Sequence, residues 1–423
     1  MNLLEELAAR RRFGMKPGLE TIRALCAALG DPQLKFKAIH VAGTNGKGAV
    51  CAILDAALRS HKGSGGVPPP HIGRYTSPHL VKINERFFLD GKPVDDATLE
   101  RVAEKVGRET EDERREITFF EALTAVAFLL YAEAKVDYAI LECGLGGRLD
   151  ATNVCNPALS VVTRIGLDHC DWLGDTLEKI AAEKAGIVKA GVPVVLGRNE
   201  PEVVDVVRRR AEEVGAPFHY APDLASESEI PTGFSLPGAF NRENAVTALA
   251  ALKVLFDCGR LPSTAVDGFR NAVWPGRFQR VGNFIVDGAH NPPAARALRT
   301  ALETEDFRQK TLDLICGFCG DKDVGEVLSI LAPIVKKGYA VRTNNPRSLS
   351  AEETAAKMCA AGIDAVACGS LKEAVELAGL KTGDGRRTLI CGSLFLAGEA
   401  LVELGAYPWG NTRFDMNESL RAI

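Results

Sequence analysis

The sequence carries no strong excess of either charge. Its 423 residues include 51 lysines and arginines against 55 aspartates and glutamates, which gives a net charge of −4. A near-neutral chain has no broad positive field with which to attract nucleic acid or an anionic membrane. We therefore expect neither as a partner, although a locally basic cleft is compatible with these totals.

The sequence also lacks a hydrophobic run long enough to span a bilayer. The apolar stretch at residues 122–132 has 11 residues between Glu121 and Glu133, about half of the roughly 20 that a spanning helix needs. It predicts a buried helix. The N-terminal segment MNLLEELAARRR places its acids before its bases and has no uniform apolar core, so we expect no signal peptide and a cytoplasmic chain.

A disulfide framework is absent as well. The 11 cysteines are an odd number and stand singly in apolar stretches, as Cys143 and Cys258 do, which is typical of reduced, buried thiols. Only Cys316 and Cys319 form a C-x-x-C pair, and no second pair or nearby histidine completes a zinc site. We interpret this pair as structural.

What the sequence does contain is an alternation of short apolar runs with helical periods, beginning near residue 36. Apolar residues make up 46% and charged residues 25% of the chain, as in globular proteins. The alternation predicts an α/β fold with parallel strands joined by crossover helices. In the first block we expect strands at residues 37–41, 136–141, 158–163 and 192–196 and helices at residues 47–60, 118–132 and 241–256.

A second, smaller alternating block follows and predicts a Rossmann-like domain. Residues 217–237 lose the periodicity before it, and proline and glycine mark the boundary at Trp274-Pro275-Gly276. We therefore expect domains at residues 1–272 and 278–423 with a linker at 273–277. The strands expected in the second block are residues 284–286, 312–316, 339–341, 364–367 and 388–391.

The clearest local motif is HVAGTNGKGAV at residues 40–50, where a buried strand enters a glycine loop and then a helix. Such a loop aims backbone N–H groups at an anion, and Lys47 at the helix start neutralises phosphate charge. A plain glycine turn is the alternative. Val41 and Ala49 depart from the general phosphate-loop pattern, and Thr44 or a water has to replace the hydroxyl that Ala49 lacks. The expected phosphate contacts are Gly43, Thr44, Asn45, Gly46, Lys47 and Gly48.

Three polar clusters follow other expected strands or their loops. They contain Ser77 and His79, then Glu142, then Asp168 and His169. Because ligands of an open parallel sheet bind outside the carboxyl ends of its strands, we expect Glu142 and His169 to converge on the edge that holds the glycine loop. A carboxylate oxygen, an imidazole nitrogen and a hydroxyl form a plausible partial shell for hydrated Mg²⁺. Taken singly, Glu142 is as well explained as a surface residue and His169 as a core histidine.

Two further segments have competing interpretations. Spacing alone favours an exposed Lys184 paired with Glu183 or Glu178. Thr118 and Glu121 fit a capping box, T-x-x-E, so their default role is to satisfy helix amides.

In the second block, Arg277 suits stabilisation of a transferring phosphoryl group. Asp287 and His290 follow a strand before a helix that starts with proline. They fit contacts to a nucleotide, or equally a structural salt bridge and a cap.

Taken together, the sequence resembles the Mur ligase superfamily and, within it, the folylpolyglutamate synthase/dihydrofolate synthase family. The resemblance covers nearly the whole chain, and it rests on ten strings in order. They are FGMKPGLETI, AGTNGKG, YTSPHL, TFFEAL, LECGLGGRLDATN, GLDHCDWLGDT, IAAEKAGI, NAVTAL, PGRFQ and DGAHNP. It implies a P-loop-type central ATPase domain followed by a glutamate-ligase domain.

The resemblance also implies roles for matching residues. Lys184 would be the lysine that the family carbamylates, which overrides the exposed interpretation, and the cofactors would be ATP and two Mg²⁺ ions. Pro17 departs from the pattern beside the pterin pocket. The implied metal ligands are Ser77, Glu142, His169 and Lys184, and the implied ATP contacts beyond the loop are Asn244, Arg277, Asp287 and His290. The implied substrate contacts are Gly18, Leu19, Glu20 and Thr118. The implied catalytic residues are Lys47, Glu142, His169, Lys184 and Arg277.

The implied activity is ATP-dependent ligation of L-glutamate to the carboxylate of dihydropteroate or folate through an acyl phosphate. We expect a monomer whose partners are small molecules. A muramyl-type amino-acid ligase and a P-loop ATPase switch remain the alternatives, because fold and phosphate loop alone host many functions. The sequence leaves open whether the product is dihydrofolate, folylpolyglutamate or both.

Overall fold

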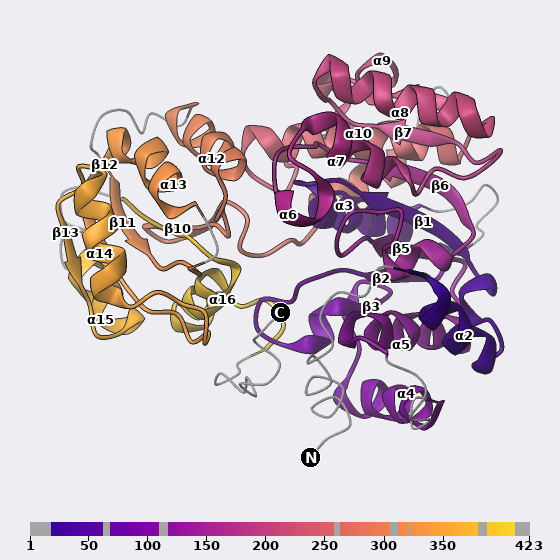
Figure 1. Ribbon diagram of the computed structural model, residues 1–423, viewed down its shortest axis with the longest axis horizontal. Coiled ribbons are helices and arrows are strands. Elements are labelled where there is room, and N and C mark those ends of the chain that lie inside the picture. Colours follow the sequence, from indigo (N-terminus) through magenta and orange to yellow (C-terminus); the bar gives the residue numbers. More distant parts are fainter. Residues whose placement is uncertain are drawn as a thin grey trace. The chain divides into compact units, whose positions relative to one another are not determined.

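The computed structural model describes residues 18–61, 68–109, 117–257, 263–304, 312–320, 323–379 and 387–410 (Figure 1). These residues form two compact units. The first unit comprises the described residues within 18–79, 83–235 and 241–273, and the second comprises those within 80–82, 236–240 and 274–410. The last segment of the second unit therefore starts at Trp274, next to the Pro-Gly pair that marked the expected linker.

The first unit is built on an eight-stranded sheet in the order β4-β3-β2-β5-β1-β6-β7-β8. All four strands expected in this block are present, as β1, β5, β6 and β7, and they are parallel. The short strands β2, β3, β4 and β8 were not predicted, and β8 lies in the segment that we expected to be irregular. The bounds are β1 Lys37–Ala42, β2 Ile72–Tyr75, β3 Phe87–Leu89, β4 Lys92–Pro93, β5 Tyr138–Glu142, β6 Pro157–Val162, β7 Val194–Leu196 and β8 Phe218–Tyr220.

Helices cover both faces of this sheet. The chain passes from β1 through α3 to β2 in one direction along the sheet, and through α5 to β5 in the other. Because parallel crossovers are right-handed, α3 and α5 lie on opposite faces. The helices are α2 Glu20–Ala28, α3 Lys47–Ser60, α4 Asp96–Glu109, α5 Phe119–Glu133, α6 Cys170–Leu173, α7 Leu177–Ala185, α8 Pro201–Val214, α9 Ala221–Leu224, α10 Ala239–Leu255 and α11 Ser263–Asp267.

The second unit has a six-stranded sheet in the order β13-β12-β11-β14-β10-β9. The five strands expected here are present and parallel, and β9 adds an antiparallel edge that was not predicted. The strands are β9 Gln279–Val281, β10 Phe284–Val286, β11 Leu312–Cys316, β12 Val335–Ala340, β13 Ala365–Ala367 and β14 Arg387–Cys391. The helices are α12 Pro292–Thr304, α13 Val324–Leu331, α14 Ala351–Ala360, α15 Leu371–Gly379 and α16 Leu394–Glu403.

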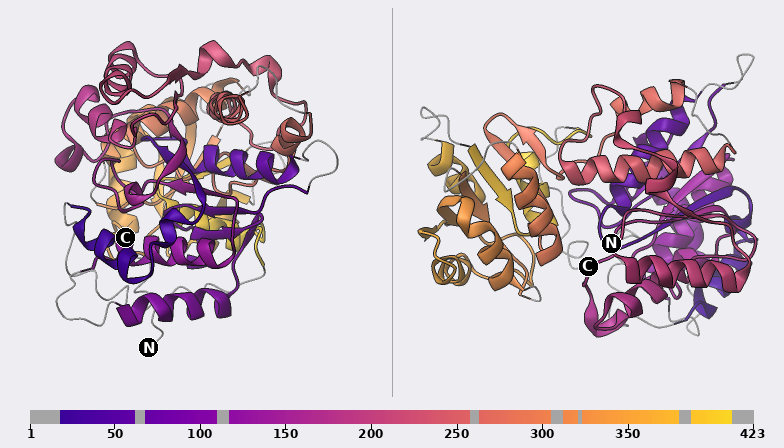
Figure 2. Two further views of the ribbon diagram at one scale, coloured as in Figure 1. Left: turned by 90° about the vertical axis from the view of Figure 1, so that its right-hand side faces the viewer. Right: turned by 90° about the horizontal axis from the view of Figure 1, so that it is seen from above.

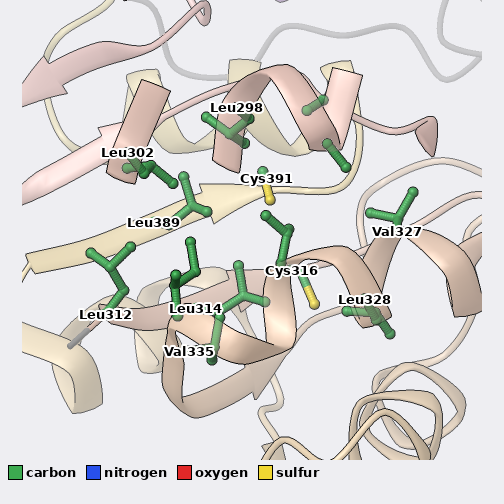
Figure 3. Packing of buried hydrophobic residues seen from close by; sticks show 14 of the residues in the cluster. Leu298, Leu302, Leu312, Leu314, Cys316, Val327, Leu328, Val335, Leu389 and Cys391 are labelled. Atoms are coloured by element: carbon green, nitrogen blue, oxygen red, sulfur yellow. The ribbon is translucent and has the colours of Figure 1, made fainter. Parts of the chain in front are cut away.

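Both faces of this second sheet are buried. Leu314 and Leu389 pack into one apolar cluster with α12, α13 and α14, which Figure 3 shows from close by. The next residues in each strand, Ile315 and Ile390, pack into a second cluster with α15 and α16. Since side chains alternate along a strand, the two clusters lie on opposite faces, and the layering of helix, sheet and helix follows (Figure 2).

The described cysteines are all free, and Cys258 lies outside the described residues. Cys316 and Cys319 are both buried, and the Cys316 thiol contacts the Met358 sulfur at 3.3 Å. Among the described residues, no helix is long and apolar enough to cross a membrane. The apolar stretch of residues 122–132 lies inside α5, as expected.

Candidate active site

A glycine loop connects β1 to α3, where the phosphate motif was expected. Gly43 and Gly46 have φ angles of 147° and 89°, a region that side chains rarely adopt. A Cβ atom on Gly43 would lie 1.9 Å from Thr163 Oγ1, and one on Gly46 would lie 2.2 Å from Asn244 Oδ1. Both glycines are therefore required by conformation and by space, and Asn244 is brought against the loop.

Hydrogen bonds fasten this loop to the segment after β6. The amides of Thr44 and Asn45 both donate to the Arg164 carbonyl, at 2.9 and 3.1 Å. The Thr44 hydroxyl donates to the Gly166 carbonyl and accepts from the Gly166 amide, both at 3.1 Å. Thr44 was one candidate to replace the hydroxyl missing at Ala49, but the structure already uses its hydroxyl to hold the loop in shape.

Two lysines converge on one backbone oxygen of the loop. Lys47 Nζ donates to the Gly43 carbonyl at 3.1 Å and to the Thr44 carbonyl at 3.3 Å. Lys184 Nζ, from α7, donates to the same Gly43 oxygen at 2.9 Å. The interpretation of Lys184 as an exposed lysine paired with Glu183 is wrong, because Lys184 is only 4% exposed and Glu183 pairs with Arg148.

Burial gives the Lys184 side chain an unusual pKa. Removal from water, followed by repulsion from Lys47, lowers the pKa of Lys184 to about 7. A large fraction of this side chain is therefore a neutral amine at physiological pH. A neutral lysine amine is a nucleophile, whereas an ordinary surface lysine is protonated.

Glu142 and Ser77 meet at the neighbouring strand ends. In the sheet register, Glu142 at the end of β5 lies beside Val41 of β1. The Ser77 amide, two residues after β2, donates to Glu142 Oε2 at 3.0 Å. Glu142 is 4% exposed, so its interpretation as a surface residue is wrong. A buried carboxylate next to a serine offers the oxygen atoms that Mg²⁺ prefers.

His169 is not a core histidine. Its side chain is 47% exposed, its φ angle is 52°, and it directly precedes the short helix α6. Asp168 is beside it, with Oδ1 accepting from the His169 amide at 3.0 Å. Across the described residues, no three His, Cys, Asp or Glu side chains cluster closely enough to hold a metal ion. The expected metal set, which includes a serine and a lysine, therefore stays a prediction.

Thr118 and Glu121 form the expected capping box at the start of α5. The Glu121 amide donates to Thr118 Oγ1 at 3.2 Å, and the Thr118 amide donates to Glu121 Oε2 at 2.8 Å. Near the start of the described chain, Gly18 has a φ angle of 139°, Leu19 precedes α2, and Glu20 is its first residue. The substrate contacts assigned to Gly18, Leu19, Glu20 and Thr118 stay predictions.

Asp150, which the sequence patterns did not mark as a site residue, holds the loop after β5 in shape. Its buried carboxylate accepts from the amides of Gly144 and Leu145, at 2.8 and 2.9 Å, and from the Thr152 amide at 3.0 Å. Burial raises its pKa. The signal was the D-x-T pattern, because an aspartate often accepts from the amide two residues later.

The second unit brings Arg277, Asp287 and His290 together. Asp287 Oδ2 and Oδ1 accept from the amides of Phe278 and Ala289, both at 2.7 Å, and the nearby Arg277 charge opposes the increase that burial causes in the Asp287 pKa. His290 Nδ1 lies 2.8 Å from the Gly288 carbonyl oxygen. Asn291, rather than Asp287 or His290, caps α12 by accepting from the Ala294 amide. The nucleotide contacts expected of Arg277, Asp287 and His290 stay predictions.

Comparison with known proteins finds two matching family models. Residues 41–213 match the Mur ligase middle domain, and residues 276–394 match the Mur ligase glutamate ligase domain. A dihydrofolate synthase/folylpolyglutamate synthase of Bacillus subtilis is 34% identical over 374 residues, which cover 81% of this chain and 85% of that protein.

Solved structures match over nearly the full length. One is E. coli FolC in complex with DHPP and ADP, with a TM-score of 0.81, 30% identity, and coverage of 96% of this chain and 98% of that one. Another is a bifunctional folylpolyglutamate synthase/dihydrofolate synthase with Mn, AMPPNP and L-glutamate bound, with a TM-score of 0.79, 31% identity and the same two coverages.

We predict that Lys184→Met raises the free energy of unfolding, most strongly near pH 6.5. The folded pKa of Lys184 is lowered to about 7 from an ordinary 10.5, so between these values the unfolded chain binds more protons and wild-type stability rises with pH. The advantage of the variant should therefore shrink by about 3 kcal/mol between pH 6.5 and 9.5. Urea unfolding in buffer free of CO₂ measures this difference, and Lys179→Met, at an exposed position of the same helix, is the control.

Proposed function

Because the chain belongs to the folylpolyglutamate synthase/dihydrofolate synthase family of Mur ligases, and is thus an ATP-dependent ligase, we propose that it joins L-glutamate to a dihydropteroate or folate carboxylate. The main support for the proposal is that Lys47, Lys184 and Glu142 surround the Gly43 loop at the carboxyl ends of the strands of the first sheet. The relatives' ligands, DHPP in one structure and L-glutamate in another, support the choice of substrates.

The chemistry needs activation of a carboxylate. An amine does not displace oxygen from a carboxylate at useful rates, so the γ-phosphoryl group of ATP first passes to the substrate carboxylate, which yields an acyl phosphate and ADP. The glutamate amine then attacks the acyl carbon. The tetrahedral intermediate collapses to an amide and releases phosphate. No side chain of the protein has to form a covalent bond to the substrate.

Within this reaction the described residues bind, orient and neutralise. The N-terminus of α3 favours the phosphate groups of the nucleotide, and Lys47 neutralises the charge of the transferred group. Asn244, which contacts Gly46 in the structure, is placed to limit the position of the nucleotide. Such fixed charges and dipoles supply most of the catalysis in phosphoryl transfer.

Magnesium fits the residues at this edge. Glu142 offers a buried carboxylate and Ser77 a neighbouring hydroxyl, and we propose them with His169 as its ligands. Bound Mg²⁺ would offset phosphate charge. We also propose that Lys184 is carbamylated. Its neutral amine would attack the carbon of CO₂ and release a proton, so that a neutral group becomes an anionic carbamate suited to a second Mg²⁺.

We propose further that the protein acts as a monomer in the cytoplasm on small molecules only. We assign the ATP-binding domain to residues 1–272 and the glutamate-ligase domain to residues 278–423. Muramyl-type ligation and ATP hydrolysis without ligation are the competing activities, because both use the same phosphate loop.

We expect purified protein to form glutamylated product only when ATP, Mg²⁺, L-glutamate and a pteroate or folate are all present. Assays with dihydropteroate and tetrahydrofolate side by side, using labelled glutamate, identify the acceptor. A panel of nucleotide sugars tests the muramyl alternative. ATP turnover without either substrate, together with no condensed product when both are present, would contradict the proposal.

Lys47→Ala and Glu142→Ala should each reduce turnover by about a hundredfold or more, because each removes a preorganised charge from the transfer site. Both variants should remain folded by circular dichroism. Lys105→Ala, at a half-exposed position paired with Glu133, is the matched control and should retain activity. Normal product formation by Lys47→Ala or Glu142→Ala would refute the assignment.

A carbamate on Lys184 should appear as a magnetic resonance signal from isotope-labelled bicarbonate that is absent in Lys184→Ala. The same variant should be inactive and should recover some activity with added acetate, whose carboxylate substitutes for the missing group. Full activity of Lys184→Ala without acetate or bicarbonate would count against carbamylation.

A further inference from the structure

The loop of residues 76–86, which joins β2 to β3 and carries Ser77 and His79, is closed at its base. The Thr76 amide donates to the Arg86 carbonyl at 3.1 Å, and the Thr76 hydroxyl donates to the Glu85 carbonyl at 3.3 Å. Thr76 and Arg86 are each 1% exposed. The two ends of the loop are therefore fixed to each other inside the protein.

The side chain of Arg86 turns back into this loop. Its Nε donates to His79 Nδ1 at 3.0 Å, so His79 accepts with Nδ1 and carries its ring proton on Nε2. Arg86 also shares a side-chain hydrogen bond with Tyr75, and its guanidinium carbon lies 6.0 Å from the centre of the Phe119 ring. These contacts connect β2, the loop and α5 through one side chain.

Stability alone explains this arginine poorly. Among the described residues, Arg86 has the largest of the fully buried side chains, and burial lowers its pKa. Among the described residues, its Nη2 atom has no hydrogen-bond partner. Burying a cation with an unmade hydrogen bond is costly, and an apolar side chain of similar size is often the more stable choice.

The residue that Arg86 holds lies close in sequence to the proposed metal ligand. His79 is two residues after Ser77, and the Ser77 amide is the group that donates to Glu142 Oε2. The positive charge of Arg86 also attracts the Glu142 carboxylate. Movement of His79 would therefore move Ser77 relative to Glu142.

We propose that Arg86 is a positioning residue of the metal site, which acts through His79 to hold Ser77 against Glu142. This rests on the proposed function, because the metal role of Ser77 and Glu142 belongs to it. Arg86 contacts neither metal nor substrate in this role. It sets the distance between two groups that do.

The test replaces His79 in two ways. In His79→Asn, the amide oxygen occupies the position of Nδ1 and still accepts from Arg86. In His79→Gln, the amide reaches the position of Nε2 and the acceptor is lost. The measurement is Mn²⁺ affinity of the full chain with AMPPNP, obtained from the paramagnetic resonance signal of free Mn²⁺, alongside thermal unfolding of each variant.

We expect His79→Gln to bind Mn²⁺ about tenfold more weakly, the effect of one lost hydrogen bond to a charged group. His79→Asn should stay within about threefold of wild type, a spread typical for a single interaction whose partner is kept. His71→Gln, at an exposed histidine bonded to Asp90, should match wild type. If His79→Gln does not fold, Arg86→Lys, which keeps the charge and loses the Nε donor, should show the same tenfold loss.

Unchanged Mn²⁺ affinity in a folded His79→Gln, or equal losses in His79→Gln and His79→Asn, would overturn the proposal, as would wild-type protein that binds no Mn²⁺. A different outcome would refute the proposed function. Wild-type protein that binds Mn²⁺ and AMPPNP but forms no glutamylated product would refute the ligation of folates and leave the Mn²⁺ comparison informative.

Discussion

The candidate active site of the first unit is organised around the carbonyl oxygen of Gly43. Lys47 and Lys184 both donate to it, and only glycine fits there, because Thr163 lies directly behind it. Burial of Lys184 raises the cost of its positive charge, and repulsion from Lys47 adds to that cost. The site is consequently built so that one of its two lysines readily gives up its proton.

The parallel strands explain why Glu142 and the segment that leads to His169 lie on the same side of the sheet as the Gly43 carbonyl oxygen. β5, β1 and β6 are adjacent and run the same way, so Glu142, the glycine loop and the segment that leads to His169 all emerge at one edge. Glu142, Lys184 and Arg86 are all buried there. Buried charges are seldom the most stable choice for a position, which is typical of sites shaped by function rather than by stability.

The elements that the sequence predicted correctly have strong local patterns. The apolar run of β1, the glycine loop and the Thr118 capping box each depend on residues within a few positions of one another. β4 and β9 were missed because Lys92–Pro93 and Gln279–Val281 lack the apolar run that marked strands just as short, such as β10. Arg86 was missed because Asn84, Glu85 and Arg86 look like a polar loop, although all three are buried.

The sequence by itself determined the alternating α/β architecture, the phosphate loop and the family resemblance, since each is written in short contiguous strings. Only the tertiary structure decided that Lys184 is buried against Gly43, that the Thr44 hydroxyl is bonded to Gly166, and that Arg86 supports His79. The physical reason is that burial and pairing depend on which distant segments the sheet brings together. Lys184 and Gly43 lie 141 positions apart in the chain, and no local pattern records their contact.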